Sequence, residues 1–133
     1  MFEWKDAYNV NLTSVDSQHK KLFRLAGDLH RAMLAGAVKA GLFRLLEDHL
    51  QYTVVHFAYE ERLMEQAGYP ELATHRAEHE DLARRVREFQ KDFEEGRIAT
   101  GITLLQFLKE WLQKHLIESD QKYVPYLKRK LVA

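Results

Sequence analysis

Histidines and carboxylates recur at helical spacings in four separate stretches of this 133-residue chain, and this pattern limits its possible folds more than any other feature. The four patterns are a lone His19, His56-x-x-x-Glu60, His75-x-x-x-His79, and His115 followed by Asp120. The chain has no cysteine to compete for a metal. Imidazole and carboxylate together suit a first-row metal such as iron better than a thiolate-type structural zinc site. The pattern predicts a two-metal centre inside a helix bundle.

The composition excludes several classes of partner. Twenty basic residues balance twenty acidic ones, so no charge excess argues for nucleic acid or a membrane surface. No stretch approaches the ~18 apolar residues of a membrane span, and the first residues lack the basic and apolar regions of a secretory signal. A chain of this size can bury one core without disulfides. We therefore expect a soluble cytoplasmic protein with a single domain over residues 1–133.

Glycine and proline stand at three places where helices are expected to break. These places are marked by Gly36 and Gly41, by Gly68-Tyr69-Pro70, and by Gly96 to Gly101. The segments between them are long and heptad-like, and they predict helices over about 16–35, 39–67, 70–95 and 101–124.

Residues near the ends of these segments predict how the helices begin and end. Asp16 or Ser17 is expected to cap the first helix, and Gly68 to follow the end of the second. Pro70 suits a position at or before the first turn of the third helix, whereas Pro125 is expected to kink or end the fourth.

Short connections between four long helices imply antiparallel neighbours. The fold class predicted is therefore all-α, an antiparallel up-down-up-down four-helix bundle preceded by an N-terminal arm, residues 1–15. The arm carries Phe2, Trp4 and Tyr8, which we expect to lie across the bundle.

Each histidine pattern is weak when taken alone. A pair such as His56 and Glu60 arises by chance, and on an exposed helix face it is an i,i+4 contact worth ~0.2–0.5 kcal/mol. This pair, however, shares a stripe with Tyr52 and Leu63, which is expected to face the bundle axis. Buried imidazoles and carboxylates are costly without partners. Several of them in one core favour a metal centre over separately hydrogen-bonded polar residues.

The five-residue step from His115 to Asp120 is unusual. At ~100° per residue, residues five apart point ~140° away from each other on a regular helix. We therefore predict a π-type bulge between them, a feature often found at functional sites.

A count of bonds then limits the chemistry. If Glu60 and Asp120 each bridge two metals and one solvent-derived oxygen bridges as well, about eleven of the twelve positions of two octahedra are filled. One position stays open for a small ligand.

These patterns resemble those of the hemerythrins, and the length and single-domain form are similar to the bacterial members. The resemblance covers nearly the whole chain and includes Trp4, the Gly68-Tyr69-Pro70 turn and the Trp111-Leu112 pair before His115. Every ligand position of the family pattern is filled.

The resemblance implies a non-haem di-iron centre, oxo- or hydroxo-bridged, that binds O2 reversibly and is not an enzyme. His75, His79 and His115 would hold one iron, His19 and His56 the other, and Glu60 and Asp120 would bridge. O2 would bind at the two-histidine iron. Its apolar pocket would be lined by Phe57, Trp111, Leu112 and Leu116, which would equally serve as ordinary core residues.

Three further residues lie near the ligand stripes. His30 and His49 are ~10–16 Å along their helices from the nearest ligand, so we expect hydrogen-bonded core histidines rather than a second metal site. Tyr123, three residues after Asp120, either reaches back to the centre or is an ordinary buried tyrosine.

Other functions compete with this one. The segment from His75 to His79 matches the reversed zinc-peptidase pattern His-x-x-Glu-His, with Glu78 as general base, but that reading leaves His19, His56 and His115 unexplained. An oxygen-activating di-iron enzyme would use Glu-x-x-His pairs, and none occurs. Storage, delivery, sensing within a larger signalling protein, and handling of nitric oxide or peroxide remain open, as does any protein partner.

Overall fold

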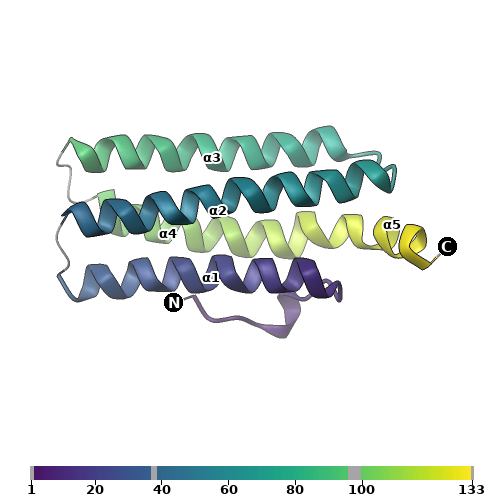
Figure 1. Cartoon of the computed structure of the whole chain (residues 1–133), viewed down its shortest axis with the longest axis horizontal. Helices are drawn as coiled ribbons and strands as arrows, with labels where there is room; N and C mark the ends of the chain where they lie inside the picture. Colours follow the sequence, from purple (N-terminus) through teal and green to yellow (C-terminus); the bar gives the residue numbers. More distant parts are fainter. Residues whose placement is uncertain (1, 37–38, 96–99, 133) are drawn as a thin grey trace.

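Four long helices lie side by side with their connections at alternating ends of the molecule (Figure 1). The structure is a computed structural model that describes residues 2–36, 39–95 and 100–132. Its helices are η1 (Asp6–Tyr8), α1 (Thr13–Leu34), α2 (Lys39–Gln66), α3 (Leu72–Glu94), α4 (Thr100–Lys114), the π-helical turn η2 (His115–Asp120) and α5 (Gln121–Val132). Within the described ranges, none of these helices is long and apolar enough to cross a membrane. These ranges contain no strand, and the predicted all-α bundle is confirmed.

The first helix begins three residues earlier than the expected cap at Asp16. α1 starts at Thr13 and includes Val15, whose side chain is completely buried. The Asp16 carboxylate instead accepts hydrogen bonds from the backbone N–H groups of Val10 (2.8 Å) and Asn11 (3.1 Å). The residue therefore ties the N-terminal arm to α1, and burial of Val15 extends the helix beyond the expected cap.

The end of α2 follows the rule that placed Gly68 after it. Gly68 has φ +68°, a left-handed conformation that glycine adopts without a steric penalty. The N–H of Tyr69 bonds to the carbonyl of Met64 (3.0 Å), and that of Gly68 to the carbonyl of Glu65 (3.1 Å), which is a Schellman motif. Pro70 precedes the first turn of α3, as predicted. Gly41, expected at a break, lies inside the first turn of α2, while residues 37–38 and 96–99 fall outside the described ranges.

The last helical segment does not end before Pro125. Pro125 lies inside α5, which continues to Val132, so the expected end of the fourth helix at about residue 124 was wrong. A proline in a helix interior costs ~3 kcal/mol. Leu127 is buried beyond it and packs in a cluster with Val10, Val15, Met64, Tyr69 and Tyr123. Burial of such side chains, at ~1.5–3 kcal/mol each, is comparable with the cost of the proline.

The N-terminal arm lies across the bundle, as its aromatic residues predicted. The Tyr8 ring stacks on Phe23 of α1 at a centroid distance of 5.2 Å, and Trp4 meets the same ring edge-on at 5.4 Å. Phe2 also contacts Phe23 edge-on. The arm thus covers the side of α1 that lies close to His19.

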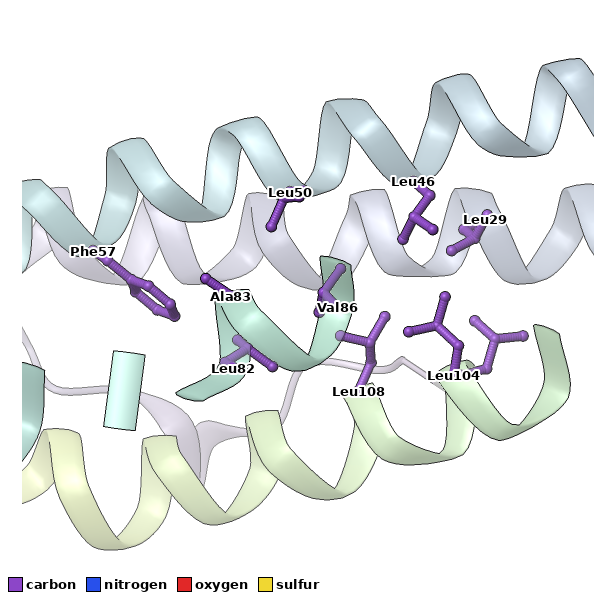
Figure 2. Packing of buried hydrophobic residues seen from close by; sticks show 10 residues of the cluster. Leu29, Leu46, Leu50, Phe57, Leu82, Ala83, Val86, Leu104 and Leu108 are labelled. Carbon is purple, nitrogen blue, oxygen red and sulfur yellow. The ribbon is translucent and has the colours of Figure 1, made fainter. Parts of the chain in front are cut away.

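Two apolar layers enclose the middle of the bundle. One gathers side chains from all four long helices, and Figure 2 shows Leu29, Leu46, Leu104 and Leu108 turned toward one another while Phe57 lies at one end of the group. The other layer is the Leu127 cluster at the opposite end. The predicted ligands lie where these two layers meet, with His56 and Glu60 on either side of Phe57 in α2, so the fold positions them in its interior.

Candidate metal centre

The structure brings all seven predicted ligands together. His19 comes from α1, His56 and Glu60 from α2, His75 and His79 from α3, and His115 and Asp120 from η2. Each side chain is at most 5% exposed. Seven polar residues from four elements therefore share one buried site, where each needs a partner.

The seven residues form two overlapping groups with metal-ligand spacing. The first group is Glu60, His75, His79, His115 and Asp120; the second is His19, His56 and Glu60. Glu60 belongs to both groups, and Asp120 also faces both, because its Oδ2 lies 3.2 Å from His19 Nε2 and its Oδ1 lies 3.0 Å from His75 Nε2. The two carboxylates therefore occupy the places that two shared ligands of a two-metal centre would occupy.

The distances within the site fit atoms that aim at a common ion. His115 Nε2 lies 2.9 Å from Asp120 Oδ1, and His79 Nε2 lies 3.1 Å from His115 Nε2. Ligand atoms at right angles and ~2.1 Å from one metal are themselves ~3.0 Å apart. Among the described residues, the buried atoms Glu60 Oε1, His75 Nε2 and both Asp120 carboxylate oxygens have no hydrogen-bond partner of good geometry. Because unpaired buried polar atoms are costly, this donor set fits metal ions.

The π turn brings His115 and Asp120, which are five residues apart, to the same side of the helix. η2 spans His115–Asp120 with π-helical geometry, so the predicted bulge is confirmed. Hydrogen bonds from residue i to i+5 widen the turn and place residues five apart near the same face. Both His115 and Asp120 consequently point into the site, whereas Ile117 between them is 48% exposed.

The two carboxylates keep histidines protonated when no metal is bound. Burial alone would lower the pKa of His19, but Asp120 and Glu60 outweigh it and raise that pKa to about 9. Burial opposes the charge of His115 in the same way, and Asp120, Glu78 and Glu60 raise its pKa to about 10. Burial also disfavours the charged Glu60 and Asp120, but the imidazoles around them hold both pKa values well below the ordinary range.

Metal affinity is expected to rise with pH for this reason. At neutral pH each incoming metal has to displace the proton of one of these histidines, His115 in one ligand group and His19 in the other, so its apparent affinity should increase by up to about tenfold per pH unit between about pH 6 and 8. Competition between the protein and a chelator for Co²⁺ at several pH values measures this slope, after correction for the chelator's own protonation. An affinity that does not change with pH would contradict the protonated state described here.

Tyr123 reaches back to the site from α5. Its hydroxyl donates a 2.6 Å hydrogen bond to Glu60 Oε2, and the side chain is completely buried. Burial and the charges of Glu60 and Asp120 raise the Tyr123 pKa well above its ordinary value, so the phenol stays protonated. The contact joins Glu60 to the apolar layer that contains Tyr123 and Leu127.

The four expected pocket residues divide into two pairs with different neighbours. The Phe57 ring stacks on His79 at 3.7 Å and Trp111 stacks on His115 at 4.3 Å, so both aromatic rings lie against the three-histidine group. Leu112 and Leu116 instead pack with Tyr8 and Phe23, on the side of the arm and α1. A surface hollow of about 690 Å³ between α3 and α4 reaches Trp111 and His115.

His30 and His49 lie outside both ligand groups. His49 is buried, its Nδ1 lies 3.4 Å from Thr53 Oγ1, and burial lowers its pKa to about 4, so the ring is uncharged. His30 is half-buried beside Phe2. Tyr52, expected on the buried stripe, is only half-buried beneath Lys21, and Thr53 is the buried residue there.

The arrangement does not suit the zinc-peptidase alternative. Glu78 lies behind His115, with its Oε2 3.4 Å from His115 Nδ1, and its side chain is 42% exposed. That alternative leaves His19, His56 and His115 without a role, yet all three belong to the same buried site as His75 and His79.

Sequence reasoning missed the partners of the outer imidazole nitrogens. Gln18 contacts His56, Glu61 contacts His79, and Glu78 contacts His115. All three directly adjoin ligands in the chain, but adjacency alone does not tell which neighbouring helix a side chain meets.

Comparison with known proteins places this geometry in a family. The family model described as "Hemerythrin HHE cation binding domain" matches residues 10–127. A bacteriohemerythrin of Stenotrophomonas maltophilia is 34% identical over 128 residues, covering 96% of this chain and 82% of that protein. Another, of Methylococcus capsulatus, is 30% identical over 96% of this chain and 97% of that protein. A crystal structure of wild-type hemerythrin superposes with a TM-score of 0.83 at 31% identity, covering 94% of this chain and 96% of that one.

Proposed function

The chain belongs to the hemerythrin family, and from this premise we propose that it is a non-haem di-iron protein that binds O2 reversibly for storage, transport or delivery. The observation that supports the proposal best is the pair of buried ligand groups that share Glu60 and both face Asp120. The proposal includes the cytoplasmic location expected from the sequence, and a role in binding rather than catalysis.

In this proposal His75, His79 and His115 hold one iron, and His19 and His56 hold the other. Glu60 and Asp120 are shared between the two irons. When bound, the irons would supply the electrons and a coordination position for a small ligand such as O2. The ligand set is rich in imidazole and poor in carboxylate, which favours binding of O2 over the high-valent chemistry of carboxylate-rich di-iron enzymes.

The protein side chains around the site have a separate task. We assign Phe57, Trp111, Leu112 and Leu116 to the lining of the O2 pocket, since all four are apolar: Phe57 and Trp111 stack on His79 and His115, and Leu112 and Leu116 pack against Phe23 of α1. Such a lining keeps water away from the centre and so hinders loss of the bound ligand and oxidation of the iron.

Anaerobic reduction of the iron-loaded protein followed by exposure to air tests the proposal. We expect two irons per chain and a visible charge-transfer band that appears with O2 and disappears when O2 is removed. Immediate and irreversible oxidation would overturn reversible binding, and would favour redox sensing or the handling of nitric oxide or peroxide at the same site. One zinc per chain and no iron would overturn the di-iron assignment itself.

A further inference from the structure

The outer nitrogens of the ligand imidazoles have different partners at the two metal positions. At the three-histidine position, His79 Nδ1 lies 3.1 Å from Glu61 Oε2, and His115 Nδ1 lies 3.4 Å from Glu78 Oε2. At the two-histidine position, His56 Nδ1 lies 2.6 Å from the amide oxygen of Gln18. His19 Nδ1 is buried and has no hydrogen-bond partner among the described residues. Two carboxylates therefore stand behind one position, and an uncharged amide stands behind the other.

Both carboxylates are held in place by a second contact. Arg76 Nε donates to Glu61 Oε1 at 2.7 Å, and Ser119 Oγ donates to Glu78 Oε1 at 3.1 Å. The Glu61 side chain is 19% exposed, and that of Glu78 is 42% exposed. Their orientation is thus fixed from outside the ligand groups, although water screens Glu78 more than Glu61.

A carboxylate behind a ligating imidazole strengthens the metal site. It accepts the Nδ1–H, fixes the tautomer that presents Nε2 to the metal, and raises the basicity of the ring. Its negative charge also attracts the cation, which the neutral Gln18 amide does not do. Loss of such an outer partner typically costs ~10–100-fold in metal affinity.

We propose that Glu61 and Glu78 act as positioning residues that make the three-histidine position the tighter of the two metal sites, so that it fills first and empties last. The inference rests on the proposed two-metal function. It concerns the order in which the two positions bind metal. A chain that binds two metals and O2 could fill the positions in either order. The third imidazole also strengthens this position, so the contribution of the carboxylates has to be measured by changing them alone.

Stepwise removal of cobalt from the protein tests the proposal. The chain loaded with two Co²⁺ ions is titrated with a chelator of known affinity, and the visible spectrum follows the loss of each ion. We expect two separate steps in the unmodified protein. His56→Ala should remove the weaker step and His79→Ala the tighter one, which assigns each step to its position.

Charge-neutral variants then separate the carboxylates from the imidazoles. Glu61→Gln should weaken the tighter step by about 10- to 100-fold and leave the weaker step nearly unchanged. Glu78→Gln should act in the same direction but less, since Glu78 is more exposed and more distant. Glu65→Gln is the matched control, because Glu65 is an exposed carboxylate on α2, four residues after Glu61.

The reverse substitution provides a test that removes no carboxylate contact. Gln18→Glu places a carboxylate behind His56 and should tighten the weaker step by about tenfold, so that the two steps approach each other. The proposal would be overturned if Glu61→Gln and Glu78→Gln changed the two titration steps no more than Glu65→Gln does. It would also be overturned if they weakened the step assigned to the two-histidine position. A chain that retains fewer than two ions before any titration would instead refute the two-metal function.

Discussion

Replacing His56 with alanine is expected to abolish reversible O2 binding. The His56 ring is 1% exposed, its Nε2 lies 3.2 Å from Glu60 Oε1, and Gln18 holds its Nδ1. His56 and His19 are the two imidazoles of the position proposed to bind O2, so the variant leaves a single imidazole there. The affinity of this position for iron should fall by more than the ~10–100-fold that typically follows removal of a hydrogen-bond partner of a ligating imidazole.

Iron analysis and visible absorption measure this effect together. The iron content should fall from two toward one per chain, and the O2-dependent band should disappear. His30→Ala is the control, because His30 also lies in the bundle but belongs to neither ligand group. Reversible O2 binding that persists in His56→Ala would refute the assignment of the O2 site.

Replacing Asp120 with alanine is expected to deplete both metal positions at once. Its carboxylate approaches three imidazoles from two sides of the site, His19 through Oδ2, and His75 and His115 through Oδ1. The Asp120 side chain is fully buried, so in the alanine variant no side chain from the protein surface is placed to replace the lost carboxylate. Without this negative charge the site retains one carboxylate for two cations, which is a poor electrostatic match in a buried environment.

Metal analysis after removal of loosely bound iron tests this expectation. We expect Asp120→Ala to retain well under one iron per chain while circular dichroism shows that the helices remain. Glu118→Ala is the matched control, since Glu118 is an exposed carboxylate on the same π turn. Retention of two irons by Asp120→Ala would show that the shared-ligand role is wrong.

Features that depend on neighbours along one helix were predictable. The π turn followed from the five-residue step between His115 and Asp120, because helical geometry converts sequence spacing directly into direction. The end of α2 followed from Gly68, because a left-handed residue terminates a helix locally. The errors at Asp16 and Pro125 arose where burial of Val15 and Leu127 outweighed the local signal.

The sequence by itself determined the four-helix class, the π turn and the seven candidate ligands. Each follows from local features of the chain, namely the glycine and proline breaks, the residue types and their spacing along a helix. The tertiary structure alone decided which amide or carboxylate lies behind which imidazole. Those contacts join α1 to α2 through Gln18, α2 to α3 through Glu61, and α3 to η2 through Glu78. They depend on how each helix is rotated and shifted against its neighbour, and the packing of the whole core sets that rotation.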